Sequence, residues 1–373
     1  MSSAAYIAVH GGAGVHGTDH EMEIKQALRR ACVAGLSTIA NSWPIASDVA
    51  GGLRTATSSP SLGMVEQGIS ILEDEERLNA GRGSNLTMDG TVECDASIMR
   101  ASGTLFGSVG AVSGVKNPIQ LAKAVLDYSC IPNRFGRIPP LTVVSSGAHK
   151  FATGKVETVT PDTLITASAH RLWTKWKARL ESLDAASQLV EDTSLNNIQD
   201  TVGAVAFHPT DGFAAGVSSG GLLLKHPGRV GEAAVFGAGC WATQKQVSAR
   251  WEGMACSISG SGEYIIRENL ARKLGEAFNS GGEEIDHHEI LNQTLIEFWS
   301  FCRERGEEEP AVGILLVVSD SEGSVRLWCA FTTASMAVAY ASSDGKKPMA
   351  VIFRHPEHHR RKPQIYITSV GLT

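Results

Sequence analysis

Two hydroxyl-bearing residues, Thr201 and Ser219, stand at the outer ends of two runs of small residues. The runs 201–207 and 213–219 flank the turn-rich stretch HPTDG, which predicts an antiparallel hairpin. A five-residue loop places Ser219 opposite Thr201, and a four-residue loop places Gly220 there instead. Directly opposed side chains have Cβ atoms about 4.5–5.5 Å apart. The hydroxyl of Ser219 is therefore expected to reach that of Thr201.

The chain changes character at Asp200 and Thr201. Segment 181–199 is mostly polar and ends close to two turn-forming asparagines, which indicates an exposed loop, and an apolar strand follows at once. A processing site needs such a junction. A threonine at a new N-terminus carries its own base, because an α-amine with a pKa of about 7.7–8.0 can take the hydroxyl proton. Cleavage between Asp200 and Thr201 would thus create a nucleophile.

Further groups that could take part in acyl transfer follow downstream. Arg229 lies in a loop framed by Pro and Gly, where its guanidinium could bind a carboxylate through two hydrogen bonds; a surface ion pair is the alternative. Ser259 and Gly260 precede a helix predicted to begin near Glu263, and a serine hydroxyl with backbone N–H groups could stabilise an oxyanion. A phosphate site is disfavoured, since Gly260-x-Gly262 lacks a third glycine and the P-loop lysine.

The elements that must position these residues follow from the pattern of apolar residues. Short apolar runs punctuated by glycine predict strands, and longer runs with helical spacing predict helices. The predicted strands are 5–10, 107–113, 201–207, 213–219, 312–318 and 324–331, and the predicted helices are about 20–40, 62–75, 118–128, 163–183, 263–280 and 288–305. Strands and helices cluster instead of alternating strictly, which favours a layered α+β fold.

The composition indicates a globular protein. A chain of 373 residues with 43% hydrophobic residues can bury a large core in one or two domains. The net charge of −6 and pI of about 6.1 argue against nucleic acid as a partner. The start MSSAAYIAVHGGAG lacks the features of a signal peptide, and no run reaches the ~18 apolar residues of a membrane span. We expect a soluble intracellular protein, cytoplasmic or nuclear, with no membrane partner.

The sequence offers little support for a metal centre. Seven scattered cysteines without a C-x-x-C pair predict buried reduced thiols rather than disulfides or zinc ligands. The run HPEHHRRKP at 355–363 contains histidines, but a run of this kind is usually a solvated loop. We therefore expect no cofactor and no metal, and leave open whether a monovalent ion binds near residues 73–79.

A series of glycine-rich and catalytic motifs runs through nearly the whole chain. The motifs are HGGAG (10–14), NAGRGSN (79–85), VECDASIM (92–99), GRIPP (136–140), DTVGAVA (200–206), SSGGLLLKHPGRVG (218–231), SGSGE (259–263) and TTASM (332–336). With them the sequence resembles the N-terminal-nucleophile hydrolases of the plant-type asparaginase family, and most of all their threonine aspartase (taspase) branch.

The resemblance implies a fold and a set of roles. The fold would be a single domain over residues 1–373, a four-layer αββα sandwich that cleaves itself into an α subunit (1–200) and a β subunit (201–373) and pairs as (αβ)2. Thr201 would be the nucleophile, Ser219 its hydroxyl partner, and Ser259 and Gly260 the oxyanion donors. The residues implied to line the site or bind the substrate are Arg229, Asn79, Glu232 and Gly262.

The branches of this family differ in what Arg229 would bind. The resemblance implies that asparaginases hold a free α-carboxylate with the arginine and an α-ammonium with an acid three residues later, whereas the aspartase holds an aspartate side chain. Asp200 favours the aspartase, and Glu232 favours the asparaginase unless it faces solvent. The main prediction is an endopeptidase that cuts proteins after aspartate; the alternative is an L-asparaginase or isoaspartyl dipeptidase. A third hypothesis, a non-catalytic binding protein on this scaffold, is disfavoured by the complete set of site residues.

Overall fold

The computed structural model describes residues 4–40, 59–182, 201–247, 250–280, 286–355 and 365–373. Most of the predicted loop 181–199, the residue Asp200 and most of the run 355–363 therefore lie outside the described residues. Thr201 is the first described residue after one of these gaps.

Two β-sheets form the framework. The strands of the larger sheet are β1 (Tyr6–Gly14), β2 (Cys94–Arg100), β3 (Leu105–Val112), β4 (Thr142–Val144), β5 (Val202–His208), β6 (Gly212–Ser219), β11 (Ser335–Ser342) and β12 (Met349–Arg354). Those of the smaller sheet are β7 (Cys240–Val247), β8 (Arg250–Gly260), β9 (Val312–Ser319), β10 (Val325–Phe331) and β13 (Tyr366–Gly371). The strand orders are β12-β11-β1-β5-β6-β2-β3-β4 and β13-β10-β9-β8-β7. In the larger sheet, the hairpin β5–β6 therefore lies between β1 and β2.

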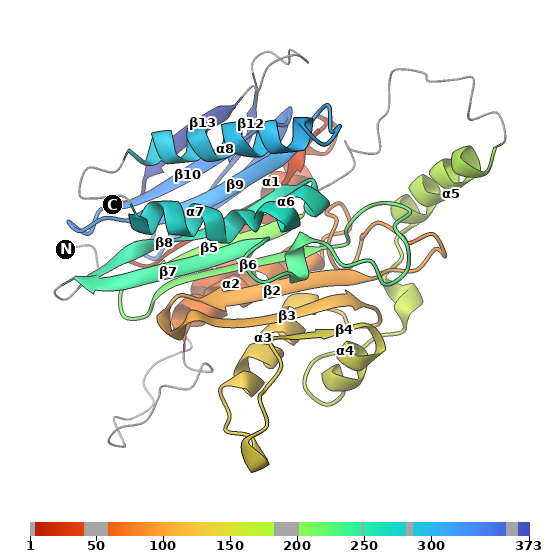
Figure 1. Cartoon of the computed structure of the whole chain (residues 1–373), viewed down its shortest axis with the longest axis horizontal. Helices are drawn as coiled ribbons and strands as arrows, with labels where there is room; N and C mark the ends of the chain where they lie inside the picture. The colour runs from red at the N-terminus through yellow and green to blue at the C-terminus, as the bar shows by residue number, and fades with distance from the viewer. Residues whose placement is uncertain (1–3, 41–58, 183–200, 248–249, 281–285, 356–364) are drawn as a thin grey trace.

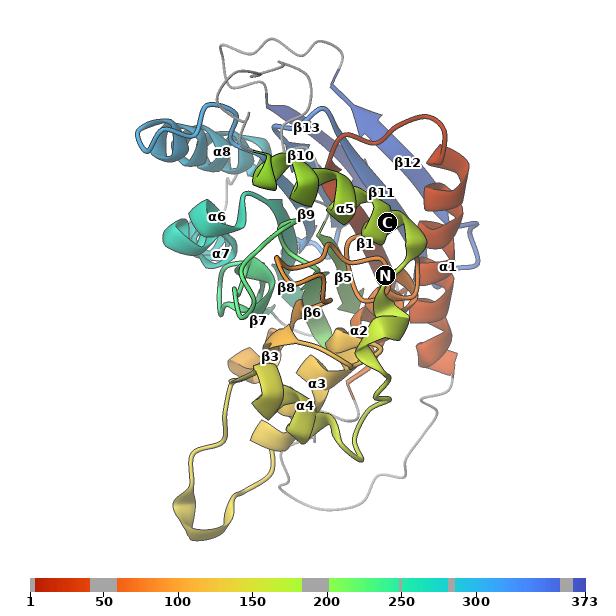
Figure 2. The ribbon, with the colours of Figure 1, turned by 90° about the vertical axis from the view of Figure 1, so that its right-hand side faces the viewer.

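Helices cover the outer face of each sheet, so the molecule has four layers (Figures 1 and 2). The larger sheet is covered by α1 (Glu21–Ala40), α2 (Pro60–Glu73) and α3 (Pro118–Ser129), and the smaller by α7 (Leu270–Ser280) and α8 (His287–Arg303). The short helices α4 (Ser145–Ala152) and α6 (Gly262–Glu268) and the helix α5 (Ala167–Glu181) complete the described set. The predicted α+β sandwich is confirmed.

The central strands are apolar on both faces because both faces are buried. Along β5, Val205 and Phe207 lie in the core between the sheets, whereas Val202 and Ala204 lie in the core beneath the helices. Successive side chains of a strand point to opposite faces, so a strand covered on both sides reads as a continuous run of apolar residues. By this alternation the odd-numbered residues of β5 face the smaller sheet.

The predicted elements differ from the observed ones at one broken helix, at helix α4, which no predicted range covers, and at several strands. The single helix predicted over 263–280 is broken at Asn269, whose left-handed backbone (φ 48°) ends α6 before α7 begins. The strands β2, β4, β7, β8, β11, β12 and β13 were not predicted. Several of them carry charged residues, such as Lys245 in β7 and Glu252 in β8, which interrupt the apolar pattern.

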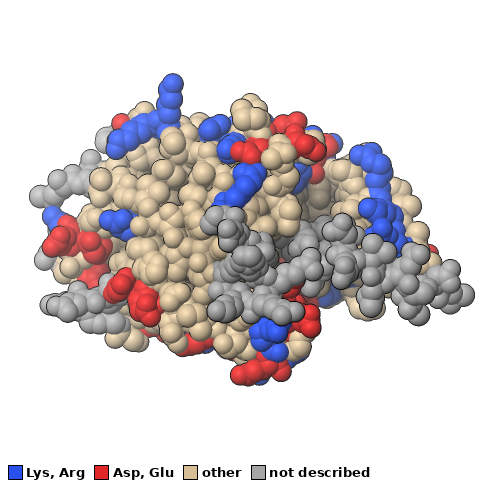
Figure 3. Space-filling view, turned by 90° about the horizontal axis from the view of Figure 1, so that it is seen from above, with Lys and Arg blue, Asp and Glu red and all other residues tan. Residues whose placement is uncertain are grey.

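The cysteine thiols and the surface charges can be compared with what the composition predicts. All seven cysteines are free thiols and six are buried, as predicted, whereas Cys130 is partly exposed. On the face shown in Figure 3, positive and negative side chains are interspersed on a largely uncharged surface. Among the described residues, no helix is long and apolar enough to cross a membrane.

Candidate active site

Thr201 and Ser219 face each other at the open end of the β5–β6 hairpin. Phe207 pairs with Phe213 and Val202 with Ser218, which is the register of the five-residue loop. The Thr201 Oγ1 and Ser219 Oγ atoms are 3.1 Å apart, and Thr201 is only 5% exposed. The backbone N–H of Gly221 donates to Ser219 Oγ over 2.9 Å and fixes that hydroxyl. The predicted contact of the two hydroxyls is confirmed.

Gly203 is required beside this pair because another side-chain pair fills the space. A Cβ atom on Gly203 would lie 2.0 Å from Ser257 Oγ and 2.5 Å from His10 Nε2. These two atoms are themselves hydrogen-bonded at 2.8 Å. Burial lowers the pKa of His10 to about 3, so its ring is neutral near pH 7. The pair packs against β5 without placing a positive charge beside Thr201.

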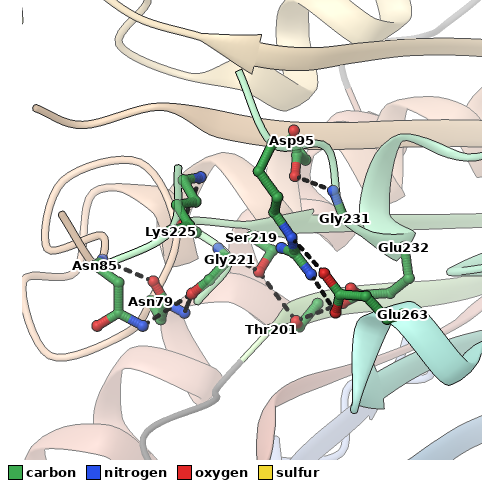
Figure 4. A network of polar contacts seen from close by, with 12 residues as sticks. Asn79, Asn85, Asp95, Thr201, Ser219, Gly221, Lys225, Gly231, Glu232 and Glu263 are labelled. Atoms are coloured by element: carbon green, nitrogen blue, oxygen red, sulfur yellow. Dashed lines mark hydrogen bonds and ion pairs between the residues drawn. The ribbon is translucent and has the colours of Figure 1, made fainter. Parts of the chain in front are cut away.

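Glu232 is a buried carboxylate in contact with Thr201, and does not face solvent. It begins a 3-10 turn (Glu232–Ala234) and is 3% exposed. The Thr201 hydroxyl donates to Glu232 Oε1 over 2.9 Å. Burial raises the pKa of Glu232, and the nearby Arg229 and the Thr201 hydrogen bond oppose that rise. Figure 4 shows Ser219 and Glu232 on different sides of Thr201.

Arg229 makes the predicted two-bond contact, but with a residue of this chain. Its Nε and Nη2 donate to the two carboxylate oxygens of Glu263 over 2.9 and 2.8 Å. Its Nη1 is buried and has no hydrogen-bond partner among the described residues. A Cβ atom added to Gly221 would lie 2.8 Å from Nη1, which places this nitrogen beside the turn after Ser219. A carboxylate ligand could therefore bind to the Nη1 end of Arg229 and leave Glu263 in place.

A pocket connects these groups. Its lining residues are Asn79, Thr201, Ser219, Gly221, Leu222, Arg229, Glu232, Gly260 and Gly262. Asn79 donates from Nδ2 to the Gly221 carbonyl and accepts from the Asn85 N–H at Oδ1, both over 2.9 Å, so it holds the turn that carries Ser219. Glycine is required at position 262, because a Cβ atom there would lie 2.4 Å from Glu232 Oε2.

Ser259 lies apart from the other predicted residues. Strand β8 continues to Gly260 and helix α6 begins at Gly262, so Ser259 lies inside the strand, just before the predicted helix. Its hydroxyl accepts from the Ala13 N–H over 3.3 Å, and it does not line the pocket. Gly260 does line it and has a backbone (φ 143°) at which a Cβ would lie 2.1 Å from the Ala311 carbonyl oxygen. The structure therefore does not bring the Ser259 hydroxyl to the pocket, and its role as an oxyanion donor stays a prediction.

Two buried charged residues near the pocket, Asp95 and Lys225, were not among the predicted site residues. Asp95 accepts from the N–H groups of Ala111 and Gly231, each over 2.8 Å, and so fixes the loop that carries Glu232. The Lys225 ammonium donates to the carbonyl of Gly220 over 2.9 Å. Both residues lie inside motifs that the sequence analysis identified, but only the folded chain brings them to the pocket.

We predict that Ser219→Ala slows hydrolysis without unfolding the protein. The change removes a hydroxyl 3.1 Å from Thr201 Oγ1, and loss of one such hydrogen bond costs about 1–3 kcal/mol, or roughly 5- to 150-fold in kcat. Turnover and thermal unfolding of the processed variant would be measured beside Ser70→Ala, which removes a buried hydroxyl of α2 bonded to the Glu66 carbonyl. An unchanged kcat in Ser219→Ala would remove Ser219 from the site.

The fold and site define a class. Helices on both outer faces of two sheets, with a threonine at the start of a central strand and a hydroxyl opposite it, describe an N-terminal-nucleophile hydrolase. Comparison with protein families narrows the class, since the asparaginase family matches residues 3–351. The chain belongs to the asparaginase family and is a hydrolase.

Individual relatives cover almost the whole chain. An isoaspartyl peptidase of Escherichia coli is 30% identical over 94% of this chain and 96% of its own length. A plant-type L-asparaginase of Pyrococcus furiosus is 29% identical over 92% and 98%. An isoaspartyl peptidase/L-asparaginase of Bos taurus is 30% identical over 93% and 96%. These relatives fit the alternative prediction from the sequence better than its main prediction of cleavage after aspartate.

Proposed function

We propose that the chain cuts itself between Asp200 and Thr201, and that the processed protein hydrolyses the side-chain amide of L-asparagine and the corresponding bond of β-aspartyl peptides. The observation that carries this proposal is that Arg229 and the buried Glu232 line one pocket around Thr201. A free α-amino acid group bears one carboxylate and one ammonium, which matches this pair of charges.

In the proposed reaction, the free α-amine of Thr201 takes the proton of its own hydroxyl. Oγ1 attacks the side-chain carbonyl carbon of the substrate, and the Gly260 N–H is proposed to stabilise the oxyanion. Collapse of this intermediate breaks the C–N bond, and the ammonium formed on Thr201 returns the proton to the leaving nitrogen. Water then hydrolyses the ester on Thr201. Ser219 holds the nucleophile in place, and Arg229 and Glu232 orient the aspartyl group.

A second candidate function is cleavage of protein chains after aspartate. One observation favours it: the residue before Thr201 is Asp200, so self-cleavage would itself occur after an aspartate. In that case Arg229 would bind an aspartate side chain. Glu232 would then meet a neutral peptide N–H, and a buried carboxylate without a cationic partner is costly. The burial of Glu232 therefore supports the first candidate.

A comparison of three substrates separates these functions. Processed protein would be given L-asparagine, a β-aspartyl dipeptide, and a peptide copying residues 194–206, with a matched peptide carrying Asn in place of Asp200. We expect hydrolysis of the first two and no cut in either peptide. A cut after aspartate in the first peptide alone, with no release of ammonia from asparagine, would establish the second candidate instead. Pairing of two αβ units stays a prediction.

A further inference from the structure

The step that creates the N-terminal threonine needs a base that the mature site does not need. Before the chain is cut, the nitrogen of Thr201 is part of a peptide bond and cannot accept a proton. The nucleophile in the uncut chain therefore depends on a neighbouring side chain for deprotonation. The side chains that contact the Thr201 hydroxyl are therefore the candidates for this base.

Among the described residues, two side chains contact the Thr201 hydroxyl. Ser219 Oγ lies 3.1 Å away and Glu232 Oε1 lies 2.9 Å away. A neutral serine hydroxyl cannot hold an extra proton, whereas a carboxylate can. The hydroxyl has one proton, and the hydrogen bond to a carboxylate is the stronger of the two. Glu232 is thus the base in position.

The surroundings of Glu232 suit this task. Among the described residues no lysine or arginine forms an ion pair with it, because the Nε and Nη2 of Arg229 are engaged by Glu263. Burial raises the pKa of Glu232 although the nearby Arg229 opposes the rise, and a raised pKa makes a carboxylate a stronger base. Its loop is held in place by the bond from the Gly231 N–H to Asp95.

We propose that Glu232 is the general base of self-cleavage, a role that rests on the proposed processing at Asp200–Thr201. The carboxylate takes the Thr201 hydroxyl proton as Oγ1 attacks the Asp200 carbonyl carbon. The C–N bond between the two residues breaks, and Glu232 returns the proton to the Thr201 nitrogen, which becomes the α-amine. Water then hydrolyses the Asp200–Oγ1 ester and restores the hydroxyl. After self-cleavage, the Glu232 carboxylate can bind the ammonium group of a substrate.

The length of the side chain is part of this inference. An aspartate would withdraw the carboxylate by about 1.5 Å, one C–C bond, from an oxygen now at 2.9 Å. The glutamate carboxylate is within hydrogen-bond distance of Thr201 Oγ1, whereas an aspartate carboxylate would be too far away. Glu232→Asp should therefore keep the base but slow its action, whereas Glu232→Gln removes the base and keeps the shape.

A matched control is available in Glu73, another fully buried glutamate at the end of α2. Its Oε1 accepts from the Ser218 hydroxyl over 2.6 Å and from the Ile119 N–H over 2.9 Å. Burial raises the pKa of Glu73 to about 8, so it is mostly protonated at pH 7 and glutamine is a close substitute. Glu73 does not line the pocket.

The test follows newly made chains in cell-free translation and measures conversion of the 39.5 kDa chain into two fragments over time. We expect Glu232→Gln to slow cleavage about 100- to 10,000-fold, Glu232→Asp to be intermediate, and Glu73→Gln to stay within threefold of the parent. Thermal unfolding of each purified variant checks that it is folded.

Failure of this inference and failure of the proposed processing give different results. A parent chain that never separates into fragments contradicts self-cleavage and with it the role of Glu232. A parent that is cut while Glu232→Gln is cut within threefold of its rate contradicts the role of Glu232 alone. Should Glu232→Gln not fold, a Glu232→Asp variant cut as fast as the parent would contradict the argument from side-chain length and overturn the assignment.

Discussion

Thr201→Ala is expected to leave the chain whole at 39.5 kDa and to abolish hydrolysis. The change removes the only atom proposed to form a covalent bond with the substrate, and the same atom is proposed to attack the Asp200 carbonyl. Loss of a catalytic nucleophile costs on the order of 10⁴- to 10⁶-fold in kcat. Fragment formation on a denaturing gel and ammonia release from asparagine would both be measured.

The matched variant for this test is Thr201→Ser, which keeps a hydroxyl at the same position. It should still cut itself and hydrolyse substrate, more slowly, because serine lacks the methyl group that restricts the threonine rotamer. Thr201 is buried beside Ser219 and Glu232, so neither change adds bulk to the site. A Thr201→Ala protein that separates into the same two fragments would show that another group cuts the chain.

Arg229→Lys is expected to lower kcat/KM about 10- to 150-fold although it conserves the charge. The guanidinium donates from Nε and Nη2 to Glu263, and its buried Nη1 lies beside Gly221, a residue that lines the pocket. A lysine ammonium is a single centre and cannot fill both positions in fixed geometry. A charged hydrogen bond contributes about 1.5–3 kcal/mol, which gives the stated range.

The control for this prediction is Arg272→Lys. Arg272 also binds a glutamate, with its Nε 2.7 Å from Glu276 Oε1, but it lies on the outer helix α7 and the pair is exposed. Its substitution should leave kcat/KM within twofold of the parent value. If Arg229→Lys behaves in the same way, the Arg229–Glu263 pair is an ordinary ion pair and the substrate carboxylate binds elsewhere.

The hairpin shows what the sequence can predict. The contact of Thr201 and Ser219 depends on a short loop and a period-two pattern, and both are local properties. The continuous apolar runs of β1 and β5 likewise reflect burial on two faces, which predicts a layered fold. The apolar periodicity predicted one helix over 263–280, but the left-handed backbone of Asn269 divides it into two. Such a residue does not change the periodicity, so the pattern could not reveal the break.

The family resemblance implied Glu232 at the site, but local sequence pattern alone could not, because its inward orientation is set by contacts distant in sequence. Asp95 holds the N–H of Gly231 from 136 positions away, and this bond turns Glu232 inward instead of toward solvent. The partner of the Ser259 hydroxyl is likewise set by a contact distant in sequence. Pairing of β8 with β9 carries the strand on to Gly260, and the hydroxyl of Ser259 is then taken by the backbone of β1.

Thr201 is proposed to become the N-terminal nucleophile, and the intact mass of the purified parent protein tests this directly. We expect two associated fragments whose masses sum to that of the chain plus one water, the second beginning at Thr201. A single unprocessed chain after long incubation, or a second fragment with any other first residue, would contradict it.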